Sequence, residues 1–365
     1  MYKALDLWLP SYLKRKPRKQ SGGPTDILFA ICDHFEPFHG SDKPEALRRI
    51  DCWKAKYPKL IEPFVDGDGF HPRHTFFYPV EQYDVDVVTN LAEMARMCRG
   101  EVELHLHHEQ DTPQSLREKF VRGRDALVKH KLAARDREGR PCYAFIHGNW
   151  ALDDSHPSGS FCGVPIELSI LRETGCYADF TMPSAPDPTQ TRTINSIYYA
   201  EDTPAPKSHD TGVLAGAETK SLRDCTNRLL MVQGPLGLNW QARKFGLLPR
   251  IENGALTGKN PPRPDRMRLW MELGVHMEIR PDWVFIKLHT HGAIPENMIT
   301  LLEEPMRSFY EYLVSHYNDG TKHRLHFVTA REMVNIIHAA EDGRDGNPGQ
   351  YRDYRFLSGN GDVAG

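Results

Sequence analysis

The segment Glu101-Val-Glu-Leu-His-Leu-His-His-Glu-Gln-Asp-Thr112 places three histidines within four residues at the end of an apolar run. If residues 102–107 form a β-strand, alternate side chains point to opposite faces, so His105 and His107 share one face. Two imidazoles on one face make half of a metal site, because neutral imidazole binds zinc and its first-row neighbours. The alternative is a solvated turn that is rich in histidine. We predict a strand that carries a metal half-site, with His108 as a further ligand if the strand ends early.

A second histidine pair follows another apolar run. Residues 283–292 read Trp-Val-Phe-Ile-Lys-Leu-His-Thr-His-Gly, so His289 and His291 again share one face at the end of a strand. An imidazole titrates near neutral pH and can protonate a leaving group, which makes either residue a candidate general acid. The alternative is a pair of structural histidines packed against Trp283 or tyrosines. One pocket lined by both pairs is the most economical explanation of the two motifs.

Strands and helices alternate along the chain, which predicts an α/β fold with a parallel sheet. Apolar and aromatic runs predict strands at residues 26–32, 75–78, 102–107, 143–147, 177–181, 229–233, 283–292 and 324–329. Helical spacing of apolar residues predicts helices at 44–60, 84–98, 114–134, 165–174, 268–275, 296–318 and 329–339. The first strand delivers Asp33 and His34 at its carboxyl end, where parallel α/β proteins bind ligands. Both are therefore candidate site residues, although Asp33 could instead cap the next helix.

The 365 residues suffice for one large α/β barrel or for two domains. We predict a single barrel domain over residues 25–340, with an insertion around 201–268 where glycine, proline and charged residues prevail. Residues 341–365 are rich in Gly and Asp and are predicted to be a disordered tail. Residues 1–24 are predicted to be a flexible or surface-associating segment, because apolar residues there precede the basic run 14–19.

The composition is that of an ordinary enzyme, and no apolar run approaches the roughly 18 residues of a membrane helix. The formal net charge of −3 is too close to neutral to indicate a nucleic-acid partner. Seven scattered cysteines without a Cys-x-x-Cys pair indicate reduced thiols in a cytoplasmic protein. Its predicted contact with a membrane is a weak association of residues 1–19 with the inner membrane surface. The sequence does not indicate an oligomeric state.

The order of these strands resembles the polysaccharide deacetylase family, whose members have a distorted (β/α) barrel with NodB homology. Five segments carry the resemblance. Ile31-Cys-Asp-His34 stands in the place of the family's Thr-Phe-Asp-Asp-Gly segment, and Thr75-Phe-Phe-Tyr78 is similar to its second strand. Residues 101–109 resemble its histidine motif, residues 283–292 its late Leu-His motif, and residues 327–332 its Phe-Val-Thr-x-x-Glu ending. The resemblance covers residues 26–340. It implies a distorted (β/α)7-type barrel of the glycoside hydrolase and deacetylase kind.

In that family one Asp and two His hold a divalent metal, the preceding Asp is the general base, and the late His is the general acid. Carried over, the resemblance implies Asp33 as the base and His34 at the position of the metal-ligating Asp. It also implies that His289 or His291 is the general acid.

The sequence departs from the family pattern at two places. The family spaces its two histidines as His-x-x-x-His, but Glu109 stands four residues after His105. The second ligand is therefore His107, His108 or Glu109. The arginine of the family's Arg-Pro-Pro-Tyr-Gly segment has no counterpart in residues 145–150, and His147 and Asp153 are candidates to fill that space.

Together these observations predict a metal-dependent hydrolase that removes an N- or O-acetyl group from a carbohydrate. The cofactor is a divalent metal ion, and zinc matches the predicted ligands best. Trp150, Asp153 and Asp179 are candidates for contact with the sugar, and Asp179 could instead orient a histidine.

Three alternatives remain from the sequence. A glycoside hydrolase of a related barrel type would need two carboxylates about 5–9 Å apart, with Asp33 and either Asp153 or Asp179 as candidates. A non-catalytic carbohydrate-binding protein is favoured by the missing arginine. A metal-dependent phosphoesterase is less favoured, because no phosphate-cradling glycine loop is present.

Overall fold

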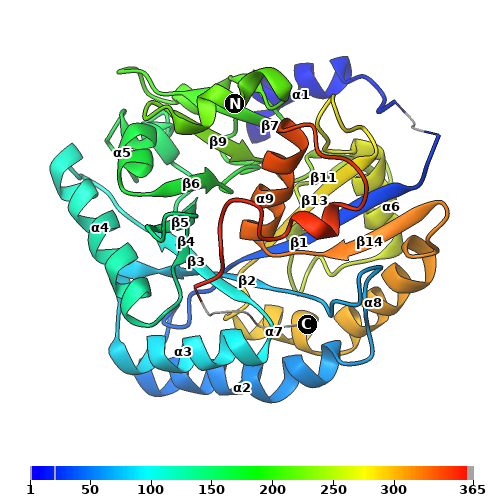
Figure 1. Ribbon diagram of the computed structural model, residues 1–365, viewed down its shortest axis with the longest axis horizontal. Helices are drawn as coiled ribbons and strands as arrows, with labels where there is room; N and C mark the ends of the chain where they lie inside the picture. Colours follow the sequence, from blue (N-terminus) through cyan, green and yellow to red (C-terminus); the bar gives the residue numbers. More distant parts are fainter. Residues whose placement is uncertain (1, 20–21, 360–365) are drawn as a thin grey trace.

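A computed structural model describes residues 2–19 and 22–359, and its centre is one large sheet (Figure 1). The strands of this sheet are β1 (Thr25–His34), β2 (Thr75–Pro79), β3 (Glu101–Leu106), β4 (Ala134–Arg135), β5 (Pro141–His147), β6 (Cys176–Asp179), β7 (Ile197–Glu201), β8 (Val213–Leu214), β9 (Arg228–Val232), β12 (Ala255–Leu256), β13 (Trp283–Thr290) and β14 (His323–Phe327). Their order is β12-β13-β1-β2-β3-β5-β6-β9-β7-β8, with β14 beside β1 and β4 beside β5.

Most neighbouring strands run parallel. Strand β1 pairs with β13 from Asp26 opposite Trp283 to Asp33 opposite Thr290, and it pairs with β14 and β2 on its other side. The antiparallel pairs are β7 with β9, β7 with β8, and β4 with β5. This largely parallel sheet with its helices confirms the predicted α/β class. Within the described residues the strand pairing does not join β12 to β8, so closure into a (β/α)7 barrel stays a prediction.

The two faces of the sheet are covered by different helices. One face packs against α2 (Lys43–Ile61), α3 (Val85–Met97), α4 (Pro113–Lys129), α5 (Glu167–Glu173), α6 (Pro264–Leu273), α7 (Pro295–Leu302) and α8 (Glu304–Tyr317). The other face packs against α9 (Ala330–Glu341), which is buried along its whole length and lies near the centre of Figure 1.

The side chains of strand β1 alternate between the two faces of the sheet. Ile27, Phe29 and Ile31 contribute to the core under the outer helices, while the residues between them contribute to the core under α9. Because strand side chains alternate, this pattern continues to the end of β1 and separates two adjacent site residues. Asp33 points toward the outer helices, and His34 points toward the α9 side.

The N-terminal segment contains a helix packed on the protein, where the sequence predicted a flexible or surface-associating region. Residues Leu5–Lys14 form helix α1, and the side chains of Trp8 and Tyr12 are buried against Leu236 and Leu273. These aromatic side chains therefore bury their apolar surface within the protein. Association with a membrane surface stays a prediction. No helix in the described ranges combines the length and apolar character needed to cross a bilayer.

The predicted insertion and tail also differ from the structure. Residues 201–268 supply β8, β9 and β12 to the main sheet, and the hairpin of β10 (Gly237–Lys244) and β11 (Leu248–Glu252) forms a separate sheet. Beyond α9 the chain up to residue 359 packs against the rest of the protein, where the buried Arg352 pairs with the carboxylates of Asp66 and Glu332. Part of the predicted disordered tail, residues 360–365, lies outside the described residues.

A buried network ties β14 to β1 and to the loop before β2. His326 Nε2 lies 2.9 Å from Asp26 Oδ1, and His326 Nδ1 lies 2.8 Å from Asp68 Oδ2. Burial alone would lower the pKa of His326, but the hydrogen bonds and charges of the two aspartates outweigh it and raise the pKa. Protonated His326 therefore stabilises the fold through two charge-assisted hydrogen bonds.

Candidate functional site

Histidines from three strands converge at the carboxyl ends of β1, β3 and β13. The ring centroid of His34 lies 4.9 Å from that of His105, 4.7 Å from that of His291 and 6.1 Å from that of His289. The register explains this, since β13 runs beside β1 with His289 opposite Cys32. The structure thus brings the early and late histidine motifs into one cluster, as expected.

Glu36 lies at the centre of this histidine cluster. Its Oε1 is 3.3 Å from Nε2 of His105 and 3.7 Å from Nε2 of both His107 and His291. Burial alone would raise the pKa of Glu36, but the contact with His105 and the neighbouring imidazoles lower the pKa to about 2. The carboxylate is therefore ionised at neutral pH. The sequence offered only a weak indication, an acidic residue two positions after His34.

Three residues of the cluster fit a divalent metal ion. One ligand atom from each of His34, Glu36 and His105 lies within 4.8 Å of the others. His34 Nδ1 and His105 Nε2 are buried and make no hydrogen bond within the described part of the chain. His105 Nδ1 lies 2.9 Å from the carbonyl oxygen of Ile146, a contact that orients Nε2 toward Glu36. Two imidazoles and one carboxylate suit zinc and other first-row metals.

Two further imidazoles of the cluster are accessible to solvent. The side chain of His107 is 30% exposed and that of His291 is 28% exposed, whereas His289 is buried. His107 Nδ1 lies 2.7 Å from Glu81 Oε1. Burial alone would lower the pKa of His107, but the interaction with Glu81 outweighs it and raises the pKa. The pKa of His291 is lowered, mainly by burial. Both imidazoles could therefore exchange protons with a substrate bound beside Glu36.

Asp33, predicted as the general base, lies on the other side of β1. Its Oδ1 accepts a 2.6 Å hydrogen bond from the backbone N–H of Gly292, and its Oδ2 lies 2.9 Å from His74 Nε2. The carboxylate is fully buried, so both oxygens are occupied and neither faces the histidine cluster. This corrects the predicted role, because adjacent strand residues point to opposite faces. Asp33 instead holds the turn that follows His291, and His74 was not identified from the sequence.

His108 and Glu109 also lie apart from the other predicted ligands. His108 Nε2 is 3.1 Å from Glu167 Oε1, in a buried group that includes His147 and Cys162. Glu109 accepts a 3.2 Å hydrogen bond from the backbone N–H of Phe161. Strand β3 ends at Leu106, so the strand alternation that aligns His105 with His107 does not extend to these residues. The prediction that His108 or Glu109 is a ligand of the first cluster is therefore wrong. Both side chains instead contact neighbouring segments of the chain.

Of the three residues predicted to contact the sugar, Asp153 and Asp179 are buried and Trp150 is half-buried. Asp153 is buried and accepts a 2.6 Å hydrogen bond from the backbone N–H of Ser208, and burial raises its pKa to about 9. Asp179 is buried and accepts hydrogen bonds from the backbone and hydroxyl of Thr181, and burial raises its pKa to about 7. Both carboxyl groups brace loops and expose no oxygen to a substrate, which corrects their predicted contact with a sugar. The alternative that Asp179 orients a histidine stays a prediction. Trp150 is half-buried, and its contact with a sugar stays a prediction.

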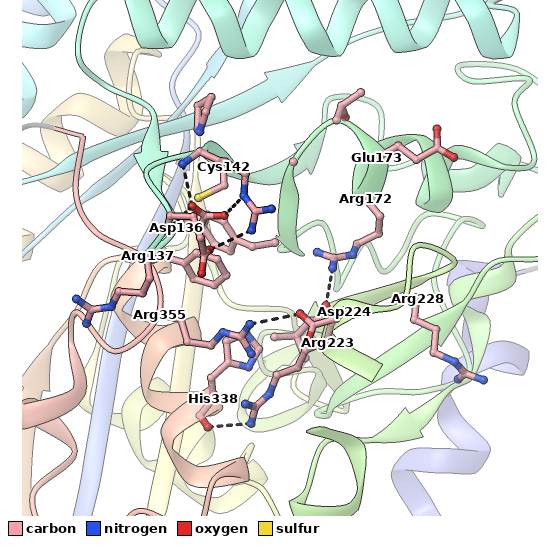
Figure 2. A pocket seen from close by; sticks show the side chains of 18 of the residues that line it. Asp136, Arg137, Cys142, Arg172, Glu173, Arg223, Asp224, Arg228, His338 and Arg355 are labelled. Carbon is pink, nitrogen blue, oxygen red and sulfur yellow. Dashed lines mark hydrogen bonds and ion pairs between the residues drawn. The ribbon is translucent and has the colours of Figure 1, made fainter. Parts of the chain in front are cut away.

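A separate cavity of about 770 Å³ lies at the opposite ends of the strands (Figure 2). Its lining includes Pro141 and Arg228, the first residues of β5 and β9, whereas the histidine cluster lies at the carboxyl ends. Its arginines already have partners, as Figure 2 shows for Arg355 with Asp224 and for Arg223 with the carbonyl oxygen of His338. This cavity is therefore distinct from the candidate site.

No model of a known protein family matches this sequence. No curated protein sequence matches it either. Among solved structures, the chain is similar to a "putative polysaccharide deacetylase" from Mycobacterium smegmatis, with 12% sequence identity and a TM-score of 0.48. The similarity covers 90% of this chain and 94% of that chain.

Proposed function

We propose that the protein is a metal-dependent hydrolase that removes an N- or O-acetyl group from a carbohydrate. The observation that carries the proposal is the convergence of His34, His105 and the ionised Glu36 beside the accessible imidazoles of His107 and His291. The first three residues would hold a divalent ion, which we propose to be zinc. When bound, such an ion supplies a Lewis acid for the acyl carbonyl and lowers the pKa of a bound water to about 7.

Each of the two accessible imidazoles, those of His107 and His291, carries out one of the two proton transfers. His107 takes the proton that the attacking water loses, and the carboxylate of Glu81 at its Nδ1 stabilises the resulting imidazolium. His291 gives a proton to the leaving nitrogen or oxygen as its bond to the acyl carbon breaks, and acetate is released. Asp33 positions His291 by holding the backbone of Gly292. Proton exchange with solvent then restores both imidazoles.

The carbohydrate part of the proposal is supported by the sequence resemblance. The five motifs that resemble polysaccharide deacetylases occur in the expected order, and two of them carry the histidine pairs of the cluster. Trp150 lies three residues after His147 at the end of β5 and offers a half-buried indole near the same edge of the sheet. Aromatic faces of this kind suit the apolar faces of sugar rings.

The competing glycoside hydrolase is disfavoured by the buried carboxylates. Asp33, Asp153 and Asp179 are each buried and engaged in hydrogen bonds, so they do not form an exposed pair across a sugar. New reducing ends, rather than acetate, would be the product of that reaction.

The test measures acetate release by untagged, zinc-loaded protein from N-acetylated chito-oligomers and from O-acetylated xylo-oligomers. We expect release from one of these two classes, loss of release after chelation, and recovery when zinc is returned. Glu36→Gln and His105→Ala should lose bound zinc as well as activity. His291→Ala should keep its zinc and lose roughly 10²–10⁴-fold in kcat, because it removes only a proton donor.

The matched control is His316→Ala, which removes an exposed histidine on α8 and should leave acetate release unchanged. Zinc-loaded protein that releases no acetate from either class would contradict the proposal. Acetate release that persists in metal-free protein would also contradict it.

A further inference from the structure

A second group of metal-ligating side chains lies beside the candidate site but is separate from it. Strands β3 and β5 pair with Leu106 opposite His147, which brings the residue after β3 and the end of β5 together. Glu167 is the first residue of α5, and Cys162 lies in the loop before this helix. The group thus joins two strand ends, one loop and one helix, and its four side chains are those of His108, His147, Cys162 and Glu167.

Glu167 is the centre of this group. Its Oε1 lies 3.1 Å from His108 Nε2 and 4.0 Å from His147 Nε2, and its Oε2 accepts a 3.1 Å hydrogen bond from Cys162 Sγ. Ligand atoms at the usual distances from zinc lie about 3.3–3.8 Å apart in a tetrahedron. The observed separations fall on both sides of this range, so small side-chain movements would complete such a site.

The group is closed to solvent, and within the described residues two of its imidazole nitrogens, His108 Nδ1 and His147 Nε2, make no hydrogen bond. All four residues are at most 4% exposed. His147 Nε2 is buried and makes no hydrogen bond within residues 2–19 and 22–359, although it faces Glu167. A buried polar atom without a partner is costly and requires an explanation, and coordination of a metal ion is one such explanation.

The outer contacts resemble those that orient metal ligands. His108 Nδ1 lies 3.2 Å from Asp111 Oδ2 without forming a hydrogen bond, close enough for a small rotation to let this carboxylate orient a ligating imidazole. The backbone N–H of Asp154 donates a 3.3 Å hydrogen bond to Cys162 Sγ, which would also stabilise a thiolate.

We propose that these four side chains bind a second, structural zinc ion. Imidazole, thiolate and carboxylate are all zinc ligands, and the four side chains supply the four ligands of a closed tetrahedral site. On binding, Cys162 releases its thiol proton, so the thiolate and the carboxylate of Glu167 balance the charge of the ion. The resulting site is electrically neutral, which suits its complete burial.

Zinc binding changes one hydrogen bond in a defined way. His147 Nδ1 accepts a 3.1 Å hydrogen bond from the backbone N–H of Asn149, so the imidazole proton is on Nε2. An ion at Nε2 moves that proton to Nδ1, and the contact with Asn149 must open. Residue 148 adjoins the active-site cluster, because a Cβ at Gly148 would meet the ring of His107. The second ion would therefore change the hydrogen bonding of the loop that lies against His107.

The test uses the sulfur ligand, which the first cluster lacks. Untagged wild-type protein should contain two zinc ions per chain if the proposed active site also binds one, and its zinc X-ray absorption should show a sulfur neighbour at about 2.3 Å. Cobalt-substituted protein should show a thiolate-to-cobalt charge-transfer band in the near ultraviolet. Cys162→Ser should lose one ion, the sulfur neighbour and the band.

Two controls separate this proposal from the proposed function. His105→Ala should lose the other ion and keep the sulfur neighbour, and Cys142→Ser, a buried cysteine at the opposite end of β5, should change neither ion. A wild-type protein without a sulfur neighbour would overturn the proposal and leave Glu167 as a buried partner of His108. This measurement needs no variant, so it decides the question even if Cys162→Ser does not fold. Sulfur ligation that persists in Cys162→Ser would equally overturn it.

Discussion

Gly292 is the position where one methyl group should disturb the candidate site most clearly. It follows His291, and a Cβ atom built on it would lie 2.0 Å from Asp33 Oδ2, 2.8 Å from Asp33 Cγ and 2.9 Å from Trp53 Cζ2. Asp33 and Trp53 are both buried, so neither side chain can move into solvent. Gly292→Ala must therefore displace either the carboxylate or the turn that carries His291.

The cost of Gly292→Ala follows from the contacts that this displacement breaks. The backbone N–H of Gly292 donates a 2.6 Å hydrogen bond to Asp33 Oδ1, and Trp53 Nε1–H donates a 2.9 Å hydrogen bond to the Gly292 carbonyl oxygen. Overpacking costs roughly 1–3 kcal/mol, and a buried hydrogen bond to a charged group contributes roughly 1.5–3 kcal/mol. We expect the free energy of unfolding to fall by about 3–5 kcal/mol. Activity should fall by about 10²-fold, because His291 moves.

Urea unfolding of Gly292→Ala measures this loss, with Gly216→Ala as the control. Gly216 has an extended backbone, and an added Cβ would meet only Ile279 Cγ2, at 4.0 Å. In a double-mutant cycle, Asp33→Ala should reduce the cost of Gly292→Ala, since it removes the clashing carboxylate. A Gly292→Ala variant within about 0.5 kcal/mol of the wild type would refute the contact geometry. A cycle without coupling would refute the assignment of the clash to Asp33.

Two further predictions concern a proton-transfer residue and the buried network of β14. Glu81→Gln should lower kcat by roughly 10–100-fold with little change in KM or zinc content, because it removes only the carboxylate that supports His107; an unchanged kcat in steady-state assays would contradict this role. His326→Gln should destabilise the fold by about 3 kcal/mol at about pH 5.5. Because the pKa of His326 is raised in the folded state, this contribution is complete below the unfolded value of about 6.5 and is lost as the pH rises through the folded pKa. Urea unfolding at several pH values checks this, and a difference between variant and wild type that is constant or grows with pH would refute it.

The central strands could be predicted because β1 is a nearly continuous apolar run and β3 alternates apolar residues with Glu101, Glu103 and His105. The strand expected at residues 26–32 is observed as Thr25–His34, and the one expected at 102–107 is observed as Glu101–Leu106. A strand that is buried on both faces is rich in apolar residues, which can be recognised in the sequence.

The helix expected at 296–318 differs from the structure, which has two helices, α7 and α8. The chain is extended at Glu303, and Pro305 lies in the first turn of the second helix. A proline has no N–H to continue the preceding helix, so the break could have been recognised from the sequence.

The candidate site was only partly predictable. Strand alternation correctly placed His105 and His107 beside a common partner, which is Glu36. The same rule applied to β1 would have placed Asp33 and His34 on opposite faces, but the family resemblance implied a shared site. The contacts of His74 with Asp33 and of His108 with Glu167 have no local pattern, because each joins segments that are far apart in the sequence.

By itself, the sequence determined the α/β class, the main strands, and the clustering of histidines at the carboxyl ends of two of them. These features depend on local periodicity. Buried side chains recur along the sequence with the period of the strand or helix that carries them. Only the tertiary structure decided that Glu36 lies among the imidazoles, that Asp33 turns away from them, and that His108 belongs to another group. Those outcomes depend on contacts between distant segments, whose distances are set by strand order and loop packing rather than by residue spacing.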